Sequence, residues 1–170
     1  MNVSEAIRTK RAIRKFNQDP LPNETIEAIL NAGRRAQSAK NMQPWQFIAV
    51  REKSTLQTLS KLGHFAGHLA GAPLGIAILT LDPEQRFSIL FDAGQAAAYM
   101  QLAAWEYGVG SCLATIYEPE AARQLLKFPQ KWHLHVAISF GYPDEDELIP
   151  RPPRKKGRSS FADTVHWERW

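Results

Sequence analysis

The sequence predicts an α+β or α/β fold, because helical and strand patterns alternate along its 170 residues and helix outweighs strand. No repeat or linker divides the chain, so we expect residues 1–170 to form a single domain. No apolar run reaches the roughly 18 residues that a membrane helix needs, and the first residues lack the apolar core of a signal peptide. Cys112 is the only cysteine, which excludes an intrachain disulfide. We therefore expect a cytoplasmic protein that does not contact a membrane.

Local patterns assign the elements of the N-terminal half in order. Asn2 followed by Glu5 resembles a capping box, which predicts a helix over residues 3–9. Pro22 and a one-sided apolar spacing predict a second helix over residues 22–35. The further expected elements are a strand at 45–50, helices at 53–62 and 64–71, and a nearly continuous apolar strand at 75–81.

The C-terminal half contains the longest helical pattern, over residues 84–107. This pattern is apolar on most sides and rich in small residues, so we expect it in the centre of the fold or at a subunit interface. A strand at 113–116, a helix at 118–126 and a strand at 135–140 follow. Residues 142–170 are rich in proline and charge, which is compatible with disorder. Because Phe161, Trp167 and Trp170 are large and apolar, we expect this tail to pack against the protein surface, across a dimer partner.

Positive charge is concentrated at both ends of the chain. The net charge is +4, and the first 15 and last 20 residues hold eleven of the 21 lysines and arginines: Arg8, Lys10, Arg11, Arg14, Lys15, Arg151, Arg154, Lys155, Lys156, Arg158 and Arg169. Clustered cations indicate a phosphate-bearing cofactor, a nucleic acid or an acidic surface as partner. A solvated charged surface is the simpler alternative, and composition does not decide between them.

Three motifs contain candidate ligand-binding residues. In residues 10–16, Lys10 and Arg14 share one side of the chain whether it is helical or extended, so both can reach one anion. Residues 35–47 supply the neutral polar groups that the edge of a flavin ring requires, although a simple turn is an alternative. Residues 155–158 place cations around a glycine, either as an anion site or as a solvated basic tail.

Taken together, these motifs resemble those of the nitroreductase family of FMN enzymes, over nearly the whole chain. Residues 7–16 resemble the family's RRSxRxF motif, and residues 36–45 resemble APSxxNxQPW. Residues 91–111 are similar to its central helix and GLGS turn, 137–143 to a strand ending in GYP, and 156–167 to KxRxPLxxxVHW. Five blocks in the correct order are a specific pattern, whereas each alone is not.

The resemblance implies an α+β fold with a central, mostly antiparallel sheet flanked by helices, in a homodimer whose tail crosses to the partner. It implies that Lys10 and Arg11, with Lys156 and Arg158 of the tail, surround the phosphate of a bound FMN. Arg14 would lie near N1 and O2 of the ring, where a cation stabilises the reduced flavin. The remaining cofactor-binding positions that it implies are Ala12, Ser38, Ala39, Asn41, Gln43, Gly110 and Ser111, of which Ser38, Ala39 and Asn41 come from the other subunit.

Two departures from the family pattern bear on binding. Ala12 stands where the family usually has serine, so one hydrogen bond of about 0.5–1.5 kcal/mol to the cofactor is missing. Gln37 replaces a proline, which leaves the loop less rigid. The chain is also short for the family. This shortness leaves the identity of the substrate undetermined, but it does not affect the prediction of the cofactor.

The expected activity is transfer of hydride from NADH or NADPH through flavin N5 to an oxidised small molecule such as a nitroaromatic or a quinone. Alternatives are a flavin-dependent dehalogenase, a dehydrogenase of a peptide or small heterocycle, and a non-catalytic FMN-binding protein. A nucleic-acid-binding module would use the basic termini but gives no role to residues 38–45. His64 and His68 have the spacing of metal ligands, but no third ligand is evident, and we expect neither a metal nor a catalytic side chain.

Overall fold

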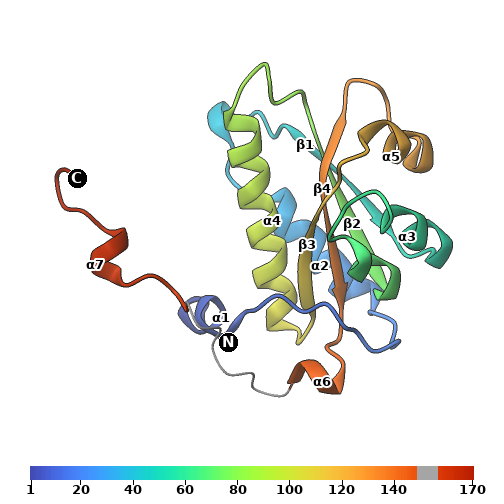
Figure 1. Ribbon diagram of the computed structural model, residues 1–170, viewed down its shortest axis with the longest axis horizontal. Coiled ribbons are helices and arrows are strands. Elements are labelled where there is room, and N and C mark those ends of the chain that lie inside the picture. The colour runs from blue at the N-terminus through green and yellow to red at the C-terminus, as the bar shows by residue number, and fades with distance from the viewer. Residues whose placement is uncertain (149–156) are drawn as a thin grey trace.

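The protein folds around a four-stranded antiparallel sheet with the strand order β1-β2-β4-β3 (Figure 1). The computed structural model describes residues 1–148 and 157–170. The strands are β1 (Trp45–Val50), β2 (Leu74–Thr80), β3 (Gly110–Thr115) and β4 (His133–Gly141). The α-helices are α1 (Val3–Thr9), α2 (Asn23–Arg34), α3 (Lys53–Leu59), α4 (Ser88–Glu106), α5 (Pro119–Leu126), α6 (Glu145–Leu148) and α7 (Phe161–Thr164). The 3-10 helices are η1 (Ala39–Asn41) and η2 (Gly67–Gly71). The expected α+β class with an antiparallel sheet is confirmed.

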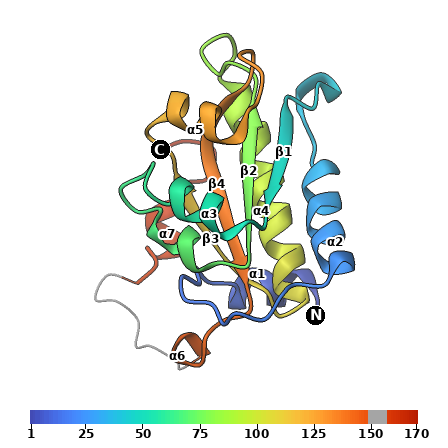
Figure 2. The ribbon, with the colours of Figure 1, turned by 90° about the vertical axis from the view of Figure 1, so that its right-hand side faces the viewer.

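Helices cover both faces of the sheet, so the core has two parts. Helices α2 and α4 pack on one face, where Ile76, Ile78 and Ile138 point (Figure 2). Helices α3 and α5 and η2 cover the opposite face, around Ala77 and Leu134. All seven residues of β2 are buried, which explains why the sequence of this strand is apolar without alternation.

Caps and close contacts fix the ends and spacing of the helices. The Asn2 side chain accepts a hydrogen bond from the Glu5 amide, as the capping box predicts. The Glu52 carboxylate caps α3, and hydrogen bonds from the Ser54 hydroxyl and from the Ser54 and Thr55 amides lower its pKa to about 2. A Cβ on Gly33 would lie 2.1 Å from Met100 Cε, so this glycine sets the close approach of α2 to α4.

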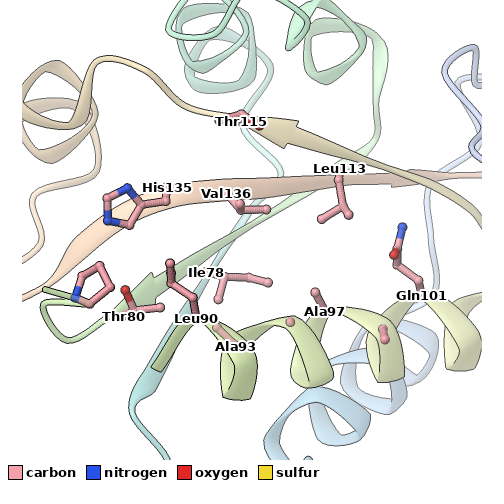
Figure 3. Close-up of a pocket in the computed structure, with 13 residues that line it drawn as sticks. Ile78, Thr80, Leu90, Ala93, Ala97, Gln101, Leu113, Thr115, His135 and Val136 are labelled. Atoms are coloured by element: carbon pink, nitrogen blue, oxygen red, sulfur yellow. The ribbon is translucent and has the colours of Figure 1, made fainter. Parts of the chain in front are cut away.

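An irregular pairing between β2 and β4 changes the direction of one side chain. Ile78 pairs with Val136, but the next residue, Leu79, pairs with Leu134. His135 is therefore an extra residue in β4, as in a β-bulge. Because a bulge interrupts the alternation of side chains, His135 and its neighbour Val136 both line the space between the sheet and α4 (Figure 3).

Some boundaries differ from the sequence prediction for identifiable reasons. Residues 64–71 form no α-helix; only η2 is present, in a segment interrupted by glycines and followed by Pro73. The predicted helix at 84–107 begins later, at Ser88, because Asp82 and Pro83 form a turn in which the Asp82 carboxylate accepts from the Glu84 amide. Strand β3 begins at Gly110, three residues before the expected start.

The last described segment, residues 157–170, lies apart from the body of the protein (Figure 1). Residues 157–170 are exposed throughout and extend away from the sheet in Figure 1. Trp170 is 99% exposed, and Phe161 and Trp167 are also exposed. Among the described residues, no helix has the length and apolar character required to cross a membrane.

Candidate functional site

The N-terminal segment that follows α1 is fixed against the edge strand β3. The Ile13 amide donates to the Ser111 carbonyl at 3.0 Å, and Ala12 bridges Ser111 in parallel. Ile13 is fully buried, and a Cβ on Gly110 would lie 2.6–2.9 Å from three of its atoms. Gly110 is therefore required for this close approach, and the contact positions the cations on either side of Ile13.

The cations of this segment fall into two groups. Arg11 donates to the Glu147 carbonyl, and Lys15 forms an ion pair with Asp146 at 3.1 Å, so both contact α6. Lys10 is partly buried, and burial lowers its pKa. Arg14 lies close enough to the Cys112 thiol to stabilise the thiolate electrostatically, although burial dominates and raises the pKa of Cys112. Lys10 and Arg14 therefore converge on the middle of β3, as the spacing of the first motif predicts.

His68 belongs to the same cluster, which the sequence did not indicate. Its Nδ1 lies 2.7 Å from the Ser139 hydroxyl, its Nε2 is buried, and the imidazole also approaches the backbone of Leu113 within hydrogen-bonding reach. Burial lowers the pKa of His68, the backbone of Leu113 opposes this shift, and Arg14 reinforces it. The imidazole is therefore neutral at pH 7, and it lies next to the cations.

The loop that contains Ser38, Ala39, Asn41 and Gln43 has a strained backbone. Asn41 and Gln43 adopt positive φ angles of 55° and 47°, and so does Lys40 at 53°. Each such residue costs about 1–3 kcal/mol, so the surroundings must hold the loop in place. The Gln43 amide donates to the Ser38 hydroxyl at 2.9 Å. The Ala39 amide donates to the buried Asp92 carboxylate on α4, at 3.2 and 3.3 Å.

Within one chain, this loop and the cations lie at opposite ends of α4 (Figure 1). Asp92 holds the loop near the start of α4, whereas Gln101 binds the Ser111 hydroxyl at 3.1 Å near its end. Nine residues of α-helix separate these two anchors by about 14 Å. The structure thus brings together Lys10, Ala12, Arg14, Gly110 and Ser111, and keeps the loop apart from them.

The remaining predicted residues are placed less directly. The Ser111 side chain is 1% exposed and engaged by Gln101, so its hydroxyl points into the protein. Arg158 is exposed on the tail, and Lys156 lies outside the described residues. In the part of the chain that the structure describes, no group of three His, Cys, Asp or Glu side chains could hold a metal ion.

A groove of about 540 Å³ runs beside this cluster, between α4 and the strands β2, β3 and β4 (Figure 3). Gln101, which binds Ser111, lines one end of it, and Thr80 and His135 line the other. Leu113 and Thr115 of the edge strand form part of its wall.

Comparison with known proteins identifies the family to which the chain belongs. The model of the nitroreductase family matches residues 7–66 and 60–142, which include the cation segment, the strained loop and all four strands. The chain belongs to the nitroreductase family. It is an oxidoreductase of that family, and the predicted resemblance is confirmed.

Relatives of this nitroreductase-family chain match most or all of its length. A protein of Methanothermobacter thermautotrophicus, which carries the provisional name NADH dehydrogenase/NAD(P)H nitroreductase, is 30% identical over 178 residues, covering 100% of this chain and 88% of the relative. The NADPH-flavin oxidoreductase of Vibrio harveyi is 27% identical, over 89% of this chain and 70% of the relative. A solved structure of an FMN-dependent nitroreductase from Clostridium difficile is 31% identical, with a TM-score of 0.85 over 97% of this chain and 98% of the other.

Proposed function

We propose that the protein is an FMN-dependent oxidoreductase that takes hydride from NADH or NADPH and reduces an uncharged small molecule, a quinone or a nitroaromatic. The observation that carries this proposal is the cluster of Lys10, Arg14 and the neutral, buried His68 imidazole at the edge of β3. It combines cations for a phosphate or a reduced ring with a neutral hydrogen-bonding group for the ring edge. The C. difficile relative is described as FMN-dependent, which supports the same cofactor.

The residues of this cluster fit FMN in distinct ways. Lys10 and Arg11 would hold the phosphate, with Lys156 and Arg158 approaching from a tail. Two cations at about 4 Å from the phosphate each contribute roughly 4 kcal/mol at an effective dielectric near 20, before desolvation is subtracted. Arg14 would lie at N1 and O2 of the ring, with the neutral His68 imidazole beside it.

A second copy of the chain would complete the site. The Ser38–Gln43 loop cannot reach the cations of its own chain, because α4 separates them by about 14 Å. In a homodimer, the loop of one subunit would face the ring bound by the other, with Ser38, Ala39 and Asn41 in contact with it. The exposed aromatic residues of the tail would then pack on the partner.

The protein would contribute binding, orientation and electrostatics to the reaction. When bound, FMN supplies N5 as the hydride acceptor, so that NAD(P)H, a proton and a quinone become NAD(P)⁺ and a hydroquinone. Arg14 would stabilise the negative charge that develops at N1 and O2. His68 is neutral at pH 7 and would orient the ring without adding charge. No side chain of the cluster has to act as a nucleophile.

Anaerobic half-reactions test this function. We expect the purified protein to retain FMN, its visible flavin absorbance to bleach on mixing with NADH or NADPH, and a quinone or nitroaromatic to restore it. If neither nucleotide reduces a flavin that dithionite reduces readily, a flavin-dependent dehalogenase or dehydrogenase, or a non-catalytic FMN-binding protein, replaces the proposal. If no FMN is retained at all, the proposed cofactor is wrong.

A further inference from the structure

Two side chains anchor the loop of residues 38–43 beside the start of α4 (Figure 1). Both carboxylate oxygens of Asp92 accept from the Ala39 amide, at 3.2 and 3.3 Å. Arg86, in the turn before α4, donates to the Met42 sulfur and to the Ala39 carbonyl at 3.4 Å. Among the described residues, no other hydrogen bond joins residues 38–43 to a residue beyond Trp45.

The choice of an acid at position 92 is not explained by packing. Asp92 is only 4% exposed, and its neighbours along α4, Ala93, Ala96 and Ala97, are small and apolar. Burial of a carboxylate costs free energy unless hydrogen bonds compensate for the lost water. Among the described residues, Asp92 forms no ion pair that could offset this cost. The carboxylate therefore indicates that a hydrogen-bond acceptor is required for the loop at this place.

The loop needs an anchor because its backbone is strained. Lys40, Asn41 and Gln43 all have positive φ angles, a region that asparagine tolerates but that lysine and glutamine rarely adopt. The bonds from the Asn41 amide to the Ser38 carbonyl and from the Gln43 amide to the Ser38 hydroxyl maintain the shape of the loop. They do not fix its position relative to α4. Strained backbone that its surroundings hold in place is common at ligand sites.

One face of α4 supports both the ends and the middle of the loop. Asp92 lies one helical turn before Ala96, so both residues are on the same face of the helix. Ala36 and Trp45, which flank the loop, form a buried cluster with Ala96. The flanks of the loop therefore rest on Ala96, and its first turn is tied to Asp92.

We propose that Asp92 and Arg86 are positioning residues, which hold residues 38–43 in the conformation that contacts FMN and so determine how tightly the cofactor binds. This inference rests on the function proposed above and adds to it the residues that act through the loop. The Ser38 oxygen accepts from the Gln43 amide, so its hydroxyl hydrogen remains to donate to the flavin ring. Asn41 Oδ1 accepts from Gln43 Nε2 at 3.2 Å, so Asn41 Nδ2 is a second donor. Displacement of the loop removes both donors from the cofactor.

Two substitutions of Asp92 separate the position of the loop from the charge of the side chain. Asp92→Ala removes the acceptor, and we expect it to raise the Kd for FMN about tenfold, because the loop no longer holds its two donors at the ring. Asp92→Asn still offers an oxygen to the Ala39 amide and should restore the Kd to within about threefold of the wild type. Arg86→Ala should raise the Kd less than Asp92→Ala. Quenching of FMN fluorescence measures these constants.

Leu59→Ala is the matched control for a general loss of stability. Leu59 is fully buried on the opposite face of the sheet, away from the loop, so its truncation destabilises the fold without touching residues 38–43. We expect this variant to bind FMN as tightly as the wild type. Equal Kd values in the wild type and Asp92→Ala overturn the proposal. Equal losses of affinity in Asp92→Ala and Asp92→Asn also overturn it, because the charge and not the loop would then act on FMN.

Limited trypsin digestion tests the anchor without the cofactor. Lys40 is exposed in the middle of the loop, so the rate of cleavage after it, followed by mass spectrometry, reports how often the loop leaves its position. In the FMN-free proteins we expect cleavage after Lys40 to be about fivefold faster in Asp92→Ala than in the wild type or in Leu59→Ala. Equal rates in all three overturn the proposal. A wild type that binds no FMN refutes the proposed function and this inference with it, whereas a wild type that binds FMN no more tightly than Asp92→Ala refutes this inference alone.

Discussion

The contact between Gly110 and Ile13 provides a direct test of how the fold positions the cations. In Gly110→Ala, the new Cβ would lie 2.6, 2.7 and 2.9 Å from Ile13 Cγ1, Cβ and Cγ2, whereas carbon atoms normally approach to about 3.5–4.0 Å. The segment that contains Lys10, Arg11 and Arg14 must therefore move outward by about 1 Å. Overpacking of this kind lowers the free energy of unfolding by about 1–3 kcal/mol.

The same displacement should weaken FMN binding by a calculable amount. Moving a cation from about 4 to about 5 Å from a phosphate charge loses roughly 0.8 kcal/mol at an effective dielectric near 20. Two cations then lose about 1.6 kcal/mol, so Gly110→Ala should raise the Kd for FMN about fifteenfold. Quenching of FMN fluorescence gives this Kd, and urea unfolding followed by circular dichroism gives the stability.

Gly71→Ala is the matched control, because a Cβ there would meet no heavy atom within 4 Å and its φ is not positive. We expect this variant to match the wild type in both measurements. If Gly110→Ala is destabilised as predicted but binds FMN as tightly as the wild type, the segment after α1 does not hold the phosphate. If Gly110→Ala changes neither quantity, the close contact with Ile13 is absent.

Three further predictions concern a cap, the strained loop and the tail. The hydrogen bonds from Ser54 lower the pKa of Glu52 from 4.5 to about 2, so this carboxylate stabilises the fold above pH 4.5 and loses that contribution as the pH falls to about 2. Between these pH values, the free energy of unfolding should fall more steeply for the wild type than for Glu52→Gln. Parallel curves for the two proteins would contradict the cap. Asp92→Ala leaves the Ala39 amide at the start of η1 unpaired and should lower the free energy of unfolding in urea by about 1–3 kcal/mol. Asp92→Asn should restore part of this stability. An equal loss of stability in both variants would show that the charge of Asp92 is essential. Arg158→Ala should lose more FMN on gel filtration than Arg151→Ala, because only Arg158 matches the phosphate motif, and equal retention would count against the role of the tail.

Local patterns in the sequence were sufficient for most elements of the fold. The cap at Asn2 and the apolar run of β2 are encoded by neighbouring residues, so α1 and β2 were predicted within one residue. The α-helix predicted at residues 64–71 is absent, because Gly67 and Gly71 disfavour a regular helix and only η2 forms. Where a few adjacent residues determine the backbone, prediction succeeds.

The site was predictable only in part, because its geometry depends on contacts between distant segments. Lys10 and Arg14 were found because their spacing places both on one side of the chain. The spacing of His64 and His68 allows a pair of metal ligands, but the surroundings of His68 depend on Ser139 and Arg14, which are far away in the sequence. Thr80 and His135 gain a shared cavity from a bulge that no local pattern indicates. No sequence motif marks such a residue.

Native mass spectrometry of the purified protein, incubated with excess FMN and then desalted, tests the central claim most directly. If cations of one subunit and the Ser38–Gln43 loop of another enclose the cofactor, the dominant species should contain two chains and two FMN molecules, and the charge-neutralised variant Lys10→Ala/Arg14→Ala should lose the FMN. A monomer without FMN, or a dimer that retains FMN equally well in that variant, would contradict the account.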